Sequence, residues 1–159
     1  MFNLLAALLS VLSTLALSPA CSPGRAATAS PWSVRVKTSG GFTGRGVGKV
    51  LIVSTGRVRY ERPETPDRRS RGCEGRLTEE ELRRLNKLIG ESNPGGWEVS
   101  GPNAAAADAI SYELELKAGG RTHQITWYDN TRAGLPEDLL RLHEEVSRVM
   151  TEQARKCAA

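Results

Sequence analysis

A strand, a glycine turn and a second strand are indicated by residues 110–127, ISYELELKAGGRTHQITW. In the first half every second residue is apolar, at Ile110, Tyr112, Leu114 and Leu116. Ala118-Gly119-Gly120 then predicts a tight turn, and His123, Ile125 and Trp127 share one face of the returning segment. The stretch therefore predicts an antiparallel β-hairpin with one buried face.

A helix is predicted before this hairpin and another after it. Thr78 and Glu81 have the spacing of a capping box, and Gly90 is a suitable end for the first helix. Its apolar residues have helical spacing, at Leu82, Leu85, Leu88 and Ile89. Pro136 suits the start of the second helix, whose apolar stripe is Leu139, Leu142, Val146 and Val149. Each helix should therefore pack one face against the sheet.

Residues 33–37 alternate polar and apolar side chains, and residues 50–53 form a continuous apolar run. A turn at 54–57 leads to further alternation at Val58 and Tyr60, which predicts a second hairpin. The complete order predicts an α+β fold with a mostly antiparallel sheet of about five strands and two helices packed on one face. We assign residues 32–151 to this single domain and residues 152–159 to a C-terminal tail.

The N-terminal segment has the features of an export signal. Leu4 to Leu17 is an uncharged run of 14 residues, which suits the apolar part of a signal peptide and is short for a membrane-spanning helix. We assign residues 1–20 to the signal and 21–31 to a flexible tether, and expect a periplasmic, secreted or lipid-anchored protein. Cys21 follows a small-residue segment, so it is either a lipidated first residue or lies near an ordinary cleavage site. A lipid on Cys21 would then be the only membrane contact.

Cys73 and Cys157 are the remaining cysteines, and in an oxidising compartment they could form a disulfide. The chain of 159 residues carries a net charge of +4, unevenly distributed: residues 25–76 contain 12 basic and 4 acidic side chains. Arginines are concentrated from Arg57 to Arg76, which indicates either a solvated loop or a contact with an anionic partner. Few aromatic residues accompany them, so nucleic acid is not expected as a partner.

The segment between the first two strands is rich in glycine and contains one aromatic residue. Its sequence from Thr38 is TSGGFTGRG, which places Phe42 between two pairs of glycines. Glycines permit unusual backbone angles and a close approach of another backbone. Two interpretations remain open: Phe42 is presented to a partner, or it folds back onto the sheet.

Ser39-Gly40-Gly41-Phe42-Thr43-Gly44 after a short strand resembles the opening motif of the emfourin family, small bacterial protein inhibitors of thermolysin-like metalloproteases. The Leu-rich helix at 77–89, the segment from Asp108 to Leu116, Gly120-Arg121-Thr122-His123 and Leu135-Pro136-Glu137 occur in a similar order. The resemblance covers about residues 33–149. It implies a metalloprotease as partner, with Phe42 entering the apolar pocket beside the catalytic zinc, the Gly40–Gly41 backbone pairing with the protease, and Arg45 at the rim.

Two other classes of function are alternatives to the inhibitor. The candidate catalytic residues are His123, Asp129, His143 and Glu144, but their spacing matches no catalytic motif, and we expect His143 on a helix surface. We therefore expect no enzymatic activity, no metal site and no cofactor. The alternative function is a non-enzymatic envelope lipoprotein or binding module whose Arg-rich loop, residues 62–76, contacts an anionic partner.

Overall fold

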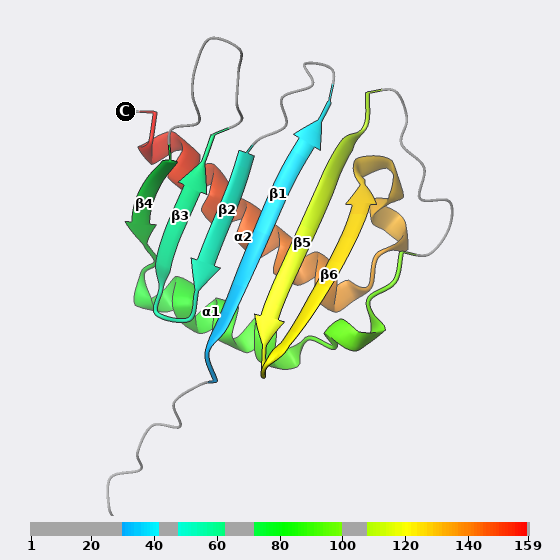
Figure 1. Ribbon diagram of the computed structural model, residues 1–159, viewed down its shortest axis with the longest axis horizontal. Helices are drawn as coiled ribbons and strands as arrows, with labels where there is room; N and C mark the ends of the chain where they lie inside the picture. Colours follow the sequence, from blue (N-terminus) through cyan, green and yellow to red (C-terminus); the bar gives the residue numbers. More distant parts are fainter. Residues whose placement is uncertain (1–29, 42–47, 63–71, 100–107, 159) are drawn as a thin grey trace, which may run out of the picture.

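The computed structural model describes residues 30–41, 48–62, 72–99 and 108–158 (Figure 1). Within these residues six strands form one sheet: β1 (Trp32–Gly40), β2 (Gly48–Val53), β3 (Arg57–Glu61), β4 (Gly72–Arg76), β5 (Ile110–Ala118) and β6 (Arg121–Tyr128). Their order across the sheet is β4-β3-β2-β1-β5-β6, and neighbouring strands are antiparallel. The first strand of the chain therefore lies near the centre of the sheet and links the two predicted hairpins.

The helices α1 (Glu79–Glu91) and α2 (Glu137–Lys156) pack together and against one face of the sheet, as predicted (Figure 1). Short 3₁₀ turns, η1 (Pro94–Gly96) and η2 (Asp129–Gly134), follow α1 and β6. The predicted capping box is present: Thr78 N donates to Glu81 Oε2 at 2.8 Å, and Glu81 N donates to Thr78 Oγ1 at 3.2 Å. Pro136 is the residue before α2 rather than its first residue.

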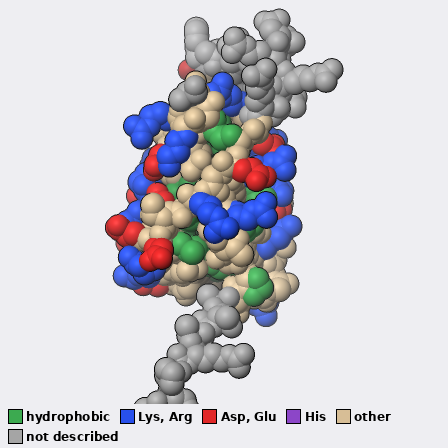
Figure 2. Space-filling model, turned by 90° about the vertical axis from the view of Figure 1, so that its left-hand side faces the viewer, with side chains coloured by type: hydrophobic (Ala, Val, Ile, Leu, Met, Phe, Trp, Pro, Cys, Tyr) green, Lys and Arg blue, Asp and Glu red, His purple; other side chains and the backbone are tan. Residues whose placement is uncertain are grey.

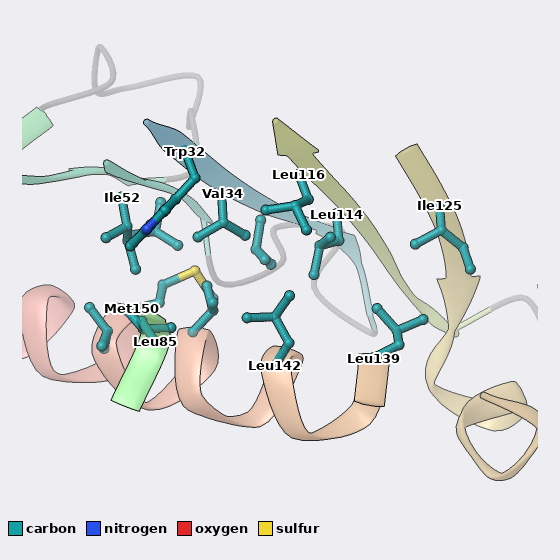
Figure 3. Close-up of a cluster of buried hydrophobic side chains, with 14 of the residues drawn as sticks. Trp32, Val34, Ile52, Leu85, Leu114, Leu116, Ile125, Leu139, Leu142 and Met150 are labelled. Carbon is teal, nitrogen blue, oxygen red and sulfur yellow. The ribbon is translucent and has the colours of Figure 1, made fainter. Parts of the chain in front are cut away.

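The core fills the space between the sheet and the helices (Figure 3). The sheet contributes the alternating apolar residues predicted from the sequence, including Val34, Ile52, Leu114 and Leu116, all without solvent exposure. They face buried helix residues, among them Leu85, Leu139 and Leu142. Trp32 closes one end of this core, where its indole Nε1 donates to Asn86 Oδ1 at 2.7 Å.

The predicted strand count was one too low, because β4 was missed. Its sequence is Gly72-Cys73-Glu74-Gly75-Arg76, which has no apolar alternation, and glycine is uncommon in strands. Backbone pairing with β3 holds the strand on one side. On its inner face a Cβ at Gly75 would lie 2.5 Å from Gln153 Oε1 of α2, so the absence of a side chain permits this close packing.

The last helix extends past the boundary predicted at residue 151, because α2 continues to Lys156. Gln153 is buried beneath β4, and Cys157, directly after the helix, forms a disulfide with Cys73. The Cα atoms of the two cysteines are 6.1 Å apart. Arg62 Nη2 donates to the Cys157 carbonyl at 2.7 Å, so the end of α2 is tied to both β3 and β4.

Candidate functional site

The Gly40–Gly41 pair ends β1 in a conformation that suits glycine. Their φ angles are +85° and +79°, in the left-handed region that residues with a side chain avoid. Gly41 N donates to the Ala109 carbonyl at 3.2 Å. A Cβ at Gly40 would lie 2.6 Å from that same carbonyl oxygen. The first half of the Gly-Gly-Phe motif is therefore explained by close packing against the segment that leads into β5.

The other end of the loop is fixed at Gly48, where the chain enters β2. Gly48 N donates to Thr38 Oγ1 at 3.0 Å, and the same hydroxyl donates to the Gly48 carbonyl at 3.3 Å. Thr38 is buried, and the two residues are also partners in the β1–β2 register. Gly48 has a φ of +122°, and a Cβ there would lie 2.5 Å from the Glu61 carbonyl oxygen. Residues 42–47 are thus connected to two fixed points on neighbouring strands.

Several predicted contact residues lie outside the described part of the chain: Phe42, Thr43, Gly44 and Arg45. Ser39 is described and exposed, and it is paired with Ser111 of β5. Sequence analysis missed Thr38 and Gly48, which form the closure of the loop. Their signal was the presence of a small polar residue and a glycine on either side of the motif, but their pairing depends on the β1–β2 register.

One end of the sheet carries the connections on both sides of this motif, and we call it the loop edge. It is formed by the strand ends Gly40–Gly41, Gly48, Glu61–Arg62, Gly72 and Ile110 (Figure 1). The chain enters the domain at the opposite end, where Trp32 pairs with Ala118. Because β1 has nine residues, the two ends are separated by about 30 Å.

The residues considered for catalysis do not form one constellation. His143 is buried rather than on the surface of its helix: its ring lies edge-on to Tyr112 and Trp127, with 5.0 Å between centroids in each case. Burial is the larger cause and the nearby positive charge of Arg132 the smaller cause of a lowered pKa of His143, which is about 4. Its Nε2 lies 3.1 Å from Ser147 Oγ. The prediction failed because Tyr112 of β5 and Trp127 of β6 pack against this position, so the buried face of α2 is wider than a single apolar stripe.

The other candidates have different neighbours. Asp129 Oδ1 accepts a hydrogen bond from Asn130 N at 2.9 Å, and Glu144 forms an ion pair with Arg132. His123 lies on β6 beside a shallow cavity of about 360 Å³ at the end of the sheet opposite the loop edge. Ile89, Ser92, Leu116 and Arg121 also line this cavity. Among the residues that the structure describes, no group of three His, Cys, Asp or Glu side chains could hold a metal ion.

The remaining predicted sites are distributed over the molecule. Cys21, Arg68, Arg69 and Arg71 lie outside the described residues, whereas the Cys73–Cys157 disulfide joins β4 to the end of α2. No described helix is long and apolar enough to cross a membrane.

Comparison with known proteins assigns no family to the chain. No family model matches it, and no curated protein matches it with significance.

Proposed function

We propose that this protein is an exported inhibitor of thermolysin-like zinc metalloproteases, with residues 39–45 inserted into the protease cleft. The observation that carries the proposal is the fixation of both ends of the segment that begins with Phe42. Gly41 is held by Ala109 of the β5 entry, and Gly48 is held by Thr38 of β1. Closing the ends before binding reduces the conformational entropy that a loop loses when it docks.

The position of the loop edge also supports this proposal. The edge is about 30 Å from the point where the tether enters the domain, so a chain anchored at Cys21 would keep the loop accessible. In this binding mode Phe42 supplies the apolar anchor and the Gly40–Gly41 backbone contacts the substrate-binding strand of the protease.

Titration of a thermolysin-like protease tests the proposal. Residues 22–159 contain every described element, so this segment retains the whole core and the disulfide. We expect stoichiometric inhibition of peptide hydrolysis, and Phe42→Ala should weaken it by about 2 kcal/mol or more, as loss of an interface anchor does.

Leu51→Ala is a matched control, because it removes a half-buried apolar side chain from β2 on the sheet face and leaves the loop intact. Its inhibition constant should stay within about twofold of the parent. An unchanged constant for Phe42→Ala, or equal losses in both variants, would exclude the anchoring role of Phe42. The absence of inhibition at micromolar protein with several such proteases would exclude the function.

A further inference from the structure

The sheet has a second face, which no described helix covers (Figure 1). Along each strand the residues between the core positions point to this outer face, as the burial pattern of β1 to β4 shows. On the β1–β4 half we define the basic sheet face by its cations, which are Arg35, Lys37, Lys49, Arg57, Arg59 and Arg76. The carboxylates placed among them are Glu61 and Glu74, and along the border with β5 the register places Glu113 opposite Lys37 and Glu115 opposite Arg35. Figure 2 views the molecule from the β4 side, so the sheet is seen edge-on, and Lys and Arg side chains lie among Asp and Glu on the visible surface.

The register places like charges directly opposite each other at two positions of this face. Lys37 pairs with Lys49 across β1 and β2, and Arg57 pairs with Arg76 across β3 and β4. Side chains at such positions are about 5 Å apart at Cβ, and like charges there destabilise a sheet. Glu113 of β5 lies opposite Lys37 on its other side and offsets part of this repulsion. A ligand that brings negative charge would relieve the repulsion that remains, above all at Arg57 and Arg76.

The carboxylates of β1 to β4 form ion pairs with only one member of each like-charge pair. Lys49 Nζ lies 2.7 Å from Glu61 Oε2, and Arg57 Nη2 lies 3.7 Å from Glu74 Oε2. Glu61 also accepts from Arg59 at 3.1 Å. Lys37 and Arg76 form no ion pair with any residue that the structure describes, and both are exposed.

The composition of the face favours a lipid surface over a protein partner. Protein interfaces are centred on buried aromatic or apolar anchors. The described outer-face residues of β1 to β4 include no aromatic side chain, and Leu51 and Val53 are the apolar ones. Arginine forms bidentate hydrogen bonds with phosphate, and the side chains of Arg57 and Arg59 are 65% and 60% exposed.

We propose that the basic sheet face binds the phosphate headgroups of an anionic phospholipid bilayer. The contact is electrostatic and lies parallel to the strands, so it occupies the broad face of the domain. It is separate from the loop edge and does not depend on the inhibitor proposal. In an exported protein it would hold the domain at the surface of the membrane with or without a lipid on Cys21.

Vesicle co-sedimentation of residues 22–159 tests this site without any contribution from Cys21. The vesicles contain equal parts of phosphatidylglycerol and phosphatidylcholine, with pure phosphatidylcholine as the neutral arm. We expect binding only to the anionic vesicles at 50 mM salt, and its loss at 500 mM salt. The double variant Lys37→Gln/Arg76→Gln should lower the partition coefficient by about tenfold or more, since each cation near an anionic surface contributes several-fold.

The control is Lys87→Gln/Arg141→Gln, which removes the same charge from exposed positions on α1 and α2. It should bind within about twofold of the parent. Thermal unfolding checks the fold: relief of the two like-charge pairs should leave the melting temperature of the Lys37→Gln/Arg76→Gln variant unchanged or raised. Absence of binding to anionic vesicles, equal binding to neutral ones, or equal losses in both double variants would overturn the proposal.

Discussion

Loss of the Cys73–Cys157 disulfide should cost this domain a large part of its stability. β4 contributes no large apolar side chain to the core, and its inner face consists of Cys73 and Gly75. The disulfide is therefore the covalent attachment of the edge strand to α2. We expect the double variant Cys73→Ala/Cys157→Ala to unfold at a lower denaturant concentration than the parent.

The magnitude follows from the chain that the disulfide closes. The cysteines are separated by 84 positions in the sequence. The loop-closure relation gives an entropy of about 15 cal/mol/K for a loop of this size, which is about 4.6 kcal/mol at 25 °C. Measured disulfides commonly contribute about 2–4 kcal/mol, so we expect a loss between about 2 and 4.6 kcal/mol.

Urea denaturation of residues 22–159 followed by circular dichroism measures this loss. The parent with reducing agent should match the double variant, and the reducing agent should not change the double variant. Amide hydrogen exchange locates the effect: β4 should lose protection before β1 and β2, which lie at the centre of the sheet. A difference below about 1 kcal/mol would refute the loop-closure reasoning, because the constraint on the unfolded chain would then be negligible.

Two further predictions concern the glycine turn and the buried histidine. Gly40→Ala should destabilise the domain by about 2–4 kcal/mol, because a left-handed φ costs about 1–2 kcal/mol and the new Cβ meets Ala109 O. Gly119 also has a positive φ, but a Cβ there would meet no atom within 4 Å, so Gly119→Ala should cost only about 1–2 kcal/mol, for the left-handed backbone. Equal shifts in melting temperature for the two variants would disprove the packing argument. The pKa of His143 is lowered to about 4, so its neutral form stabilises the fold fully above pH 6.5 and this contribution is lost as the pH falls toward 4. The free energy of unfolding should drop by about 2 kcal/mol between pH 7 and pH 5 in urea titrations. His143→Leu should remove this pH dependence, and an equal drop in the variant would show that His143 is not its cause.

The sequence predicted those elements that have a regular chemical pattern. The 110–127 hairpin and the capped helix at Thr78 were found because alternation and capping are local properties of the chain. β4 has neither property, since backbone pairing and a gap for Gln153 determine its position. β4 forms because of partners that are far away in the sequence, so no local sequence pattern predicts it.

The same distinction applies to the candidate site. Gly40 and Gly41 were identified by their residue type, but the contact with Ala109 that requires glycine lies almost 70 residues further along the chain. His143 was placed on the helix surface because a single apolar stripe was assumed. In the structure its ring lies against Tyr112 and Trp127 of the β5–β6 hairpin.

The two proposed surfaces are compatible because one lies along the strands and the other lies at their ends. The basic sheet face is parallel to the strands, whereas the loop edge lies at their ends. A bilayer in contact with Lys37 and Arg76 would therefore extend along the strand direction and leave the strand ends at its margin. The tether enters at the far end of β1, so it would restrain the domain without covering Gly40 or Gly41. Membrane attachment and protease binding thus require different residues, and substitutions in one surface separate the two activities.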